Sequence, residues 1–224
     1  MIEFSDVHVR LGLRDVLCGV TLSLAERRVG VIGANGSGKS TLARLINGLA
    51  LPTSGSVTVL GRDTRRHGAR IRRDVGFVFT DPDAQIVMPT VAEDVAFSLR
   101  RKGLRPEEVE RRVGAVLAEN GLSEHADHPA HQLSGGQKQL LALCSVLVLE
   151  PRVLVMDEPT TLLDLRHSRQ FAGVLRGLPH QVVVVTHDLT LLEDFDRVVV
   201  LDGGRVVADD EPGAAIGHYR KLMA

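Results

Sequence analysis

The sequence is poor in aromatic residues and in cysteine, and it contains no tryptophan. Aromatic residues make up 3% of its 224 residues, with one tyrosine. We therefore expect an aliphatic core, and a hydrophobic share of 44% is enough to build a sizeable one. Cys18 and Cys144 stand far apart in apolar contexts. Two such residues indicate buried, reduced thiols rather than a disulfide framework.

A strong net charge and a long apolar run are also lacking. The net charge of −1 excludes a global basic field for nucleic acid. Two arginine-rich stretches, 62–66 and 70–73, are expected to be solvated loop. The longest apolar run, 140–149, is about half of a bilayer span. The first six residues do not resemble a signal peptide. We therefore expect a soluble, cytosolic chain whose membrane role, if it has one, depends on a partner.

Strand-like apolar runs recur along the chain, with helical patterns between them. Several runs are continuous β-branched stretches, which suits strands covered on both faces of a parallel sheet. This alternation predicts an α/β fold. The last two runs flank Asp202-Gly203-Gly204 and predict a hairpin. The runs are residues 7–9, 29–32, 56–60, 75–79, 153–156, 182–186, 198–201 and 205–208.

The middle of the chain, from about residue 90 to 149, contains no convincing strand. Thr90 and Glu93 have the spacing of a capping box, which opens a helix. Pro106 is typical of the first turn of a second helix. Residues 136–149 predict a third. A helical insert therefore interrupts the α/β core.

A glycine-rich loop lies between the strand-like run 29–32 and a helical pattern that begins near residue 42. Glycines let a backbone curl around a phosphate chain, and the following helix N-terminus attracts anions. The lysine can reach β- and γ-phosphates, and the serine hydroxyl can bind Mg²⁺. The loop consists of Gly33, Ala34, Asn35, Gly36, Ser37, Gly38, Lys39, Ser40 and Thr41.

Three further elements carry polar groups that suit a phosphate site. The stretch Leu133, Ser134, Gly135, Gly136 and Gln137 offers a hydroxyl, small residues and a helix N-terminus. Asp157 and Glu158 end the apolar run 153–156, and His187 follows the run 182–186. Strand ends of this kind meet at the carboxyl edge of a parallel sheet, where ligands bind.

With these motifs in this order, the chain resembles the ATP-binding subunits of ABC transporters. The resemblance covers the whole chain and includes a loop at 161–164 that ends in Asp164. It implies a P-loop NTPase of the ABC ATPase type with a RecA-like core, an antiparallel β subdomain and an inserted helical subdomain. We expect one domain over 1–224, with the core at 1–80 and 151–224 and the helical subdomain at 81–150.

The resemblance also implies roles for the motif residues. Glu158 should orient and polarise the attacking water, with His187 bracing it and contacting the γ-phosphate. Lys39 should stabilise charge on the transferred phosphoryl group. Asp157 and Ser40 should hold Mg²⁺.

In the family, the stretch 134–137 covers the γ-phosphate of ATP held by a facing subunit, and the resemblance implies that Asp164 also binds nucleotide. A complete site would then need two ATP-binding subunits. A homodimer would hold two such sites by symmetry.

Two positions depart from the family pattern. Leu11 stands where an aromatic residue usually stacks on adenine, so the base contact would be aliphatic. Thr80 occupies the place of a glutamine that reaches Mg²⁺. Threonine is too short for that distance, so a water, Asp81 or Gln85 would have to fill the gap. We favour water because Pro82 stiffens the loop.

The segments 81–87 and 90–97 resemble energy-coupling factor (ECF) ATPases, which power uptake of vitamins and transition metals. The chain is most similar to the ATPases of biotin transporters, followed by those of cobalt and nickel importers. This implies a peripheral subunit on the cytoplasmic face of the membrane, with a transmembrane coupling protein and a substrate-binding membrane protein as partners. Residues 86–97 would form the groove for the coupling helix.

Two other functions remain open at this point. One is a non-transport ABC ATPase that acts on nucleic acid, ribosomes or cofactor assembly, although the chain lacks a second such domain and a coiled-coil insertion. The other is an ATP sensor without hydrolysis, against which Glu158 argues. His125, His128 and His131 are evenly spaced, but Pro129 interrupts a regular helix, so we expect a loop rather than a metal site.

Overall fold

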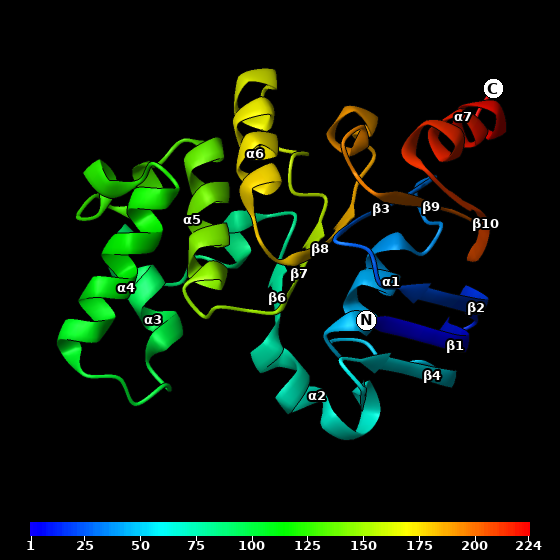
Figure 1. Cartoon of the computed structure of the whole chain (residues 1–224), viewed down its shortest axis with the longest axis horizontal. Coiled ribbons are helices and arrows are strands. Elements are labelled where there is room, and N and C mark those ends of the chain that lie inside the picture. Colours follow the sequence, from blue (N-terminus) through cyan, green and yellow to red (C-terminus); the bar gives the residue numbers. More distant parts are fainter. The chain divides into compact units, whose positions relative to one another are not determined.

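The computed structural model describes all 224 residues, and its contacts divide the chain into two compact units (Figure 1). We call residues 1–77, 152–158 and 180–224 the core unit, and residues 78–151 and 159–179 the helical unit. The range 159–179 lies outside the segment 81–150 that the sequence analysis assigned to the helices.

The larger sheet of the core unit has six strands in the order β10-β9-β3-β8-β7-β6. β3 lies parallel to β8 and β9, β7 is parallel to β8, and β10 closes the edge as an antiparallel hairpin with β9. The valine-rich centres of these strands are buried, as the continuous apolar runs predict. The α/β architecture is therefore confirmed. The strands are β3 (Arg28–Gly33), β6 (Val75–Val78), β7 (Val153–Asp157), β8 (Gln181–Val185), β9 (Arg197–Asp202) and β10 (Arg205–Asp210).

The smaller sheet is antiparallel, in the order β2-β1-β4-β5. Its strands are β1 (Ile2–Leu11), β2 (Arg14–Leu24), β4 (Ser54–Val59) and β5 (Arg62–Asp63). None of the apolar runs predicts β2. Its buried residues Leu17, Val20, Leu22 and Leu24 alternate only after an irregularity, where the register against β1 shifts. A bulge of this kind breaks the two-residue period that identifies a half-buried strand.

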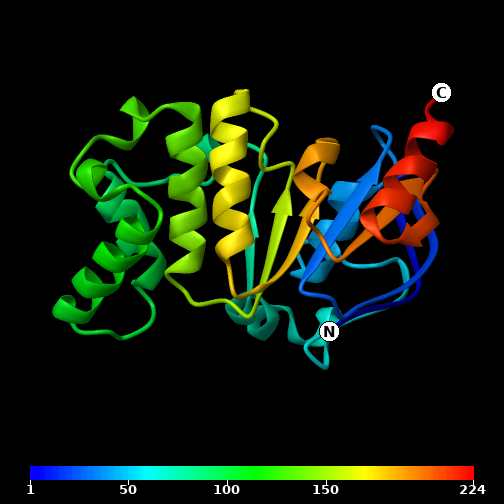
Figure 2. The ribbon, with the colours of Figure 1, turned by 45° about the horizontal axis from the view of Figure 1, so that its top comes forward.

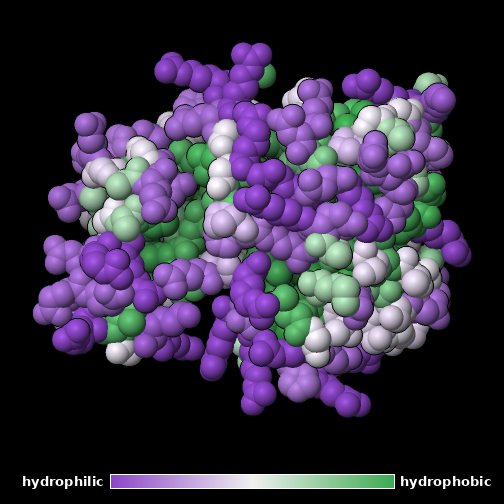
Figure 3. All heavy atoms as spheres, viewed as in Figure 1, coloured by the Kyte–Doolittle hydropathy of each residue, from purple (hydrophilic) through white to green (hydrophobic).

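Three helices belong to the core unit: α1 (Lys39–Ile46), α2 (Thr64–Asp74) and α7 (Pro212–Leu222). The expectation of a solvated loop over the arginine-rich stretches is wrong, since α2 forms there. The Asp63 side chain caps α2 by accepting from the backbone N–H groups of Arg65 and Arg66, and Ile71 is buried. The arginines remain on the outside, where hydrophilic side chains protrude over α2 (Figure 3).

The helical unit contains α3 (Val91–Leu99), α4 (Pro106–Glu119), α5 (Gly135–Leu147) and α6 (Leu165–Gly177). α3 packs against α4 and α5, while α5 and α6 lie side by side (Figure 2). None of the seven helices combines the length and the apolar character that a bilayer-spanning helix needs. Short 3₁₀ turns cover Pro82–Ala84, Ser123–His125, Ala130–Gln132 and, in the core unit, Leu189–Leu192.

Candidate functional site

The glycine-rich loop connects β3 to α1 and has a backbone that glycine alone tolerates at two points. Gly33 and Gly38 have φ angles of 155° and 102°. A Cβ atom on Gly33 would collide with the carbonyl oxygen of Leu201, and one on Gly38 would lie 2.7 Å from that of Val16. Gly38 is also the N-cap of α1 and provides no side-chain cap. The first N–H groups of α1 therefore have no side-chain acceptor, which suits an anion.

Lys39 lies at the centre of this loop and is 7% exposed. Its Nζ donates to the carbonyl oxygens of Gly33 at 2.8 Å and Ala34 at 3.1 Å. Burial lowers the pKa of Lys39, while Glu158 and Asp157 act in the opposite direction. The amine is thus held inside the loop by groups that a phosphate oxygen can replace.

Ser40 and Asp157 bring two oxygen ligands together across 117 residues of sequence. The Ser40 hydroxyl donates to Oδ1 of Asp157 at 2.8 Å, and Arg44 lies 3.9 Å from Oδ2. Burial raises the pKa of Asp157, and the bond from Ser40 opposes that shift. A hydroxyl beside a buried carboxylate fits a hard divalent cation such as Mg²⁺.

Glu158 and His187 come from the ends of the neighbouring strands β7 and β8. The Glu158 backbone has a left-handed φ of 54°, and its N–H donates to the Val185 carbonyl at 2.8 Å. Its Oε2 lies 2.7 Å from Nδ1 of His187 and accepts from the His187 backbone N–H at 3.2 Å. The turn therefore fixes the carboxylate against the imidazole.

A cleft of about 400 Å³ extends from the glycine-rich loop and Glu158 to the β1–β2 hairpin. Leu11, 62% exposed, lines it, as the base contact predicted from the sequence would. Arg14 also lines it and donates to the Gly36 carbonyl at 3.2 Å. The sequence does not predict Arg14 as a lining residue, because its only signal is a basic residue three positions after Leu11. The other lining residues are Val16, Asn35, Gly36, Gly38, Lys39, Ser40, Thr41 and Glu158.

In the helical unit, the stretch 134–137 opens α5 through a capping box. The Ser134 hydroxyl accepts from the Gln137 backbone N–H at 3.3 Å, and the Ser134 N–H donates to Oε1 of Gln137 at 2.9 Å. Gly136 packs directly against the His167 ring. His167 bonds to Asp164, the N-cap of α6, at 2.8 Å. Ser134, Gly135 and Asp164 are exposed at the starts of these two helices, while Leu133 and Gly136 are buried beneath them.

Thr80 follows β6 in the helical unit, so it belongs to a different unit from Ser40 and Asp157. Gln85 is one of the alternatives to a water, and both ends of its side-chain amide bond to backbone groups of the helical unit. Its Oε1 accepts from the Phe79 N–H at 3.2 Å, and its Nε2 donates to the Ala142 carbonyl at 3.1 Å. Asp81 accepts from the Asp83 N–H at 3.0 Å. Gln85 is thus bonded to its own loop and to α5, and Asp81 is bonded within the loop.

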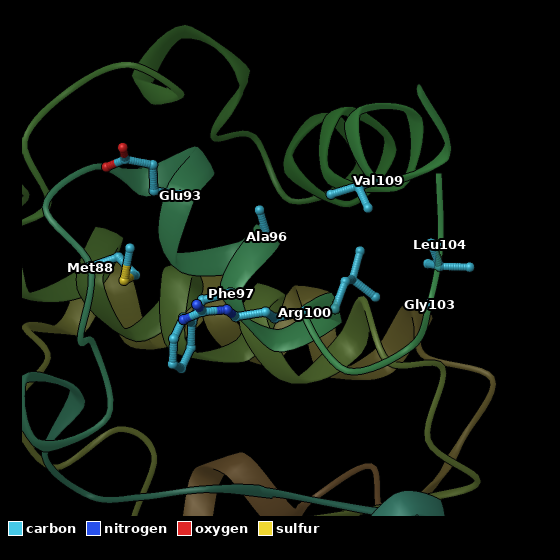
Figure 4. Close-up of a pocket in the computed structure, with 9 residues that line it drawn as sticks. Met88, Glu93, Ala96, Phe97, Arg100, Gly103, Leu104 and Val109 are labelled. Carbon is cyan, nitrogen blue, oxygen red and sulfur yellow. The ribbon is translucent and has the colours of Figure 1, made fainter. Parts of the chain in front are cut away.

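A second hollow, of about 380 Å³, opens between α3, α4 and the loop that joins them (Figure 4). Phe97 is 43% exposed at this hollow. Buried Asp94 anchors its rim by accepting from the Val87 and Met88 N–H groups at 2.8 and 3.0 Å and from the Ser145 hydroxyl at 2.9 Å. The lining residues are Met88, Glu93, Ala96, Phe97, Leu99, Arg100, Gly103, Leu104 and Val109.

Comparison with known proteins agrees with this geometry. A family model described as ABC transporter matches residues 18–161. The chain therefore belongs to the ABC transporter family and has the ABC ATPase fold that its motifs predict.

Two curated relatives narrow the comparison. The biotin transport ATP-binding protein BioM of Rhizobium etli is 48% identical over all of this chain and 99% of its own length. The energy-coupling factor transporter ATP-binding protein EcfA1 of Caldanaerobacter subterraneus is 44% identical over 82% of this chain and 69% of its own length. The predicted resemblance to ECF ATPases is confirmed.

A solved structure extends the likeness to three dimensions. The ATP-binding cassette MJ0796, a dimer in a post-hydrolysis state with ADP and Pi, gives a TM-score of 0.83 at 30% identity. The match covers 95% of this chain and 99% of that one. The chain is thus an ATPase of the ABC class, as predicted.

Proposed function

We propose that this chain is the ATP-binding and ATP-hydrolysing subunit of an ECF-type importer. One observation supports the proposal most strongly. Lys39 and Ser40 lie in the glycine-rich loop, Asp157 is bonded to Ser40, and Glu158 lines the same cleft. Residues 1–224 act as a single ABC domain, in which residues 81–150 form the inserted helical subdomain.

The core unit supplies the hydrolytic groups. Ser40 and Asp157 hold Mg²⁺, which neutralises phosphate charge when bound. Lys39 moves from its carbonyl partners to the β- and γ-phosphates and stabilises charge on the transferred phosphoryl group. Glu158 orients and polarises the attacking water. His187 holds the Glu158 carboxylate in place and contacts the γ-phosphate. Thr80 contributes to the metal through a water.

The adenine base packs in the part of the cleft formed by the β1–β2 hairpin. Leu11 supplies an apolar contact, and the planar guanidinium of Arg14 supplies a face for stacking. The backbone N–H groups of the loop 33–41 receive the phosphates. No aromatic side chain lines this cleft.

A second ATP-binding subunit, a homodimer partner, completes each site. Ser134, Gly135, Gly136 and Gln137 cover the γ-phosphate of ATP bound to that subunit, and Asp164 lies beside them. The dimeric MJ0796 cassette supports this arrangement. ATP favours the closed dimer because it contacts both subunits only when they are closed.

A transmembrane coupling protein docks at the hollow beside α3, and a substrate-binding membrane protein completes the transporter. The half-exposed Phe97 and the acidic Glu93 suit an amphipathic helix that carries a basic residue. The subunit would then lie on the cytoplasmic face of the membrane. Biotin is the favoured substrate because a relative is named for biotin transport, with cobalt or nickel ions next.

Co-expression with candidate membrane partners tests the transporter role. We expect the chain to co-purify from detergent-solubilised membranes with an integral membrane protein, and Phe97→Asp to abolish this. Leu222→Asp, on a side chain 41% exposed in α7, is the matched control and should leave co-purification intact. Recovery with ribosomes or DNA instead would favour the alternative, a non-transport ABC ATPase acting on nucleic acid, ribosomes or cofactor assembly.

A further inference from the structure

A chain of hydrogen bonds joins two histidines to the residue that caps α5. Nε2 of Gln137 lies 2.8 Å from Nε2 of His125. Nδ1 of His125 lies 2.9 Å from Nδ1 of His128, with the ring centroids 5.0 Å apart. Gln137 in turn accepts from Ser134 at 2.9 Å. Neither histidine has a role in the function proposed above.

The donors in this chain can be assigned one after another. The Ser134 N–H needs an acceptor, so it fixes the oxygen of the Gln137 amide on its own side. The Gln137 nitrogen then faces His125 and carries hydrogens, so Nε2 of His125 must accept. A neutral His125 therefore holds its proton on Nδ1 and donates it to Nδ1 of His128. Each imidazole has one tautomer.

An additional proton cannot be placed without breaking a bond. A proton on Nε2 of His125 would face the Gln137 amide hydrogens. A proton on Nδ1 of His128 would force the proton of His125 onto Nε2, which leads to the same conflict. Turning the Gln137 amide would satisfy His125 but would point its hydrogens at the Ser134 N–H. Protonation of either imidazole and an intact capping box are therefore incompatible.

The titratable groups around this segment do not bond to either imidazole. On the packed elements they are Glu93 of α3, which bonds to Thr90, Glu119 of α4, and Lys138 of α5, which bonds to Asp83. His167 faces Gly136 from α6 and bonds to Asp164. The segment itself carries Glu124, Asp127 and His131. The protonation of His125 and His128 therefore depends on the hydrogen bonds that join them to each other and to Gln137.

We infer that His125 is a positioning residue for the stretch 134–137, and that only its neutral form holds Gln137 in the capping geometry. Uptake of a proton by His125 or His128 releases Gln137 and loosens the N-terminus of α5. This inference rests on the proposed function, because it is the ATP of a second subunit that this stretch would cover. Acidification from pH 8.0 to pH 5.5 then weakens the ATP-dependent dimer.

The test uses the full-length chain with Glu158→Gln, which traps bound ATP. ATP-dependent dimerisation is measured by light scattering at pH 8.0 and 5.5, and binding of a fluorescent ATP analogue is measured in parallel. We expect the dimer affinity of the His125 protein to fall about fivefold more than that of a His125→Gln variant, the effect of about one hydrogen bond. His125→Gln keeps an acceptor but does not titrate.

His131→Gln, on an exposed histidine outside the chain of bonds, is the control and should keep the pH profile of the parent. Identical profiles for the parent and His125→Gln would overturn the inference. If ATP binds but no dimer forms with any variant, the role proposed for the second subunit fails instead. The nitrogen chemical shifts of the His125 ring then test the inference without a dimer. At pH 8.0 we expect the proton of His125 on Nδ1. A proton on Nε2 would contradict the inference.

Discussion

The core unit and the helical unit hold their motif residues in opposite ways. Lys39 and Asp157 are 7% and 2% exposed, and Lys39 lies close enough to the Asp157 and Glu158 carboxylates for their charges to act on it. Ser134, Gly135 and Asp164 are exposed, and caps at helix N-termini hold their local geometry. Buried charge suits chemistry, since electrostatic effects are larger away from water. An exposed, capped stretch suits contact with a ligand that a second molecule brings.

The largest expected effect tests the chemical side of this contrast. Glu158→Gln should lower ATP hydrolysis about 10²–10⁴-fold, the usual contribution of a general base, because the amide cannot accept a proton from water. Phosphate release measures the rate, and a fluorescent ATP analogue should still bind. A variant that hydrolyses ATP within threefold of the parent would remove Glu158 from the chemistry.

The next prediction concerns packing in the helical unit. A Cβ atom at Gly136 would lie 2.6 Å from Cγ of His167, whereas one at Gly135 would meet nothing closer than the Leu162 carbonyl at 3.6 Å. We expect Gly136→Ala to lower the free energy of unfolding by about 1–3 kcal/mol through overpacking. Gly135→Ala serves as its control for stability. Chemical denaturation measures both, and equal stabilities would contradict the packing argument.

A third prediction is an increase in the free energy of unfolding, and it concerns the buried carboxylate of Asp157 in the core unit. Because burial raises the pKa of Asp157, the folded state favours the protonated carboxyl. Stability is therefore greater below the unfolded pKa and decreases as the pH rises through the folded one. Asp157→Asn should raise the free energy of unfolding at pH 7.5, without nucleotide or Mg²⁺, by on the order of 1 kcal/mol.

The same variant should gain stability and lose activity. Hydrolysis by Asp157→Asn should be lost, because an amide is a poor ligand for Mg²⁺ compared with a carboxylate. Thermal unfolding at pH 7.5 and pH 5 checks the sign, since the difference between parent and variant should shrink at the lower pH. A variant less stable than the parent at pH 7.5 would contradict the prediction, since the contacts with Ser40 and Arg44 would then outweigh the cost of burial.

The smallest effect concerns the base contact. Arg14→Ala should raise the dissociation constant for ATP about two- to fivefold through loss of a stacking face, and Arg14→Tyr should restore it. Arg10→Ala is the control, since Arg10 lies in the same hairpin but bonds to Asp15 at 2.7 Å. Titration with a fluorescent analogue measures each value. Equal affinities for all three variants would leave Leu11 as the base contact.

Sequence patterns predicted the parts of the site that are local. The loop 33–41 and the strand ends at 157–158 and 187 follow from apolar runs beside characteristic polar residues. Arg14 and His167 were missed because their partners, Gly36 and Gly136, lie 22 and 31 positions away. The strand β2 was missed because a bulge disturbs its alternation. The helix α2 was missed because so few of its residues are apolar.

The bonds that hold Lys39 have a consequence for which nucleotides the cleft selects. Its ammonium group donates two of its three hydrogens to the carbonyl oxygens of Gly33 and Ala34, so a nucleotide competes with these oxygens for the cation. In the role proposed for Lys39, oxygens of the β- and γ-phosphates take the place of these carbonyls. AMP has neither of these phosphates, so it would leave Lys39 bonded to the two carbonyl oxygens. On the proposed role of Lys39, the cleft would therefore distinguish ADP and ATP from AMP by the length of the phosphate chain.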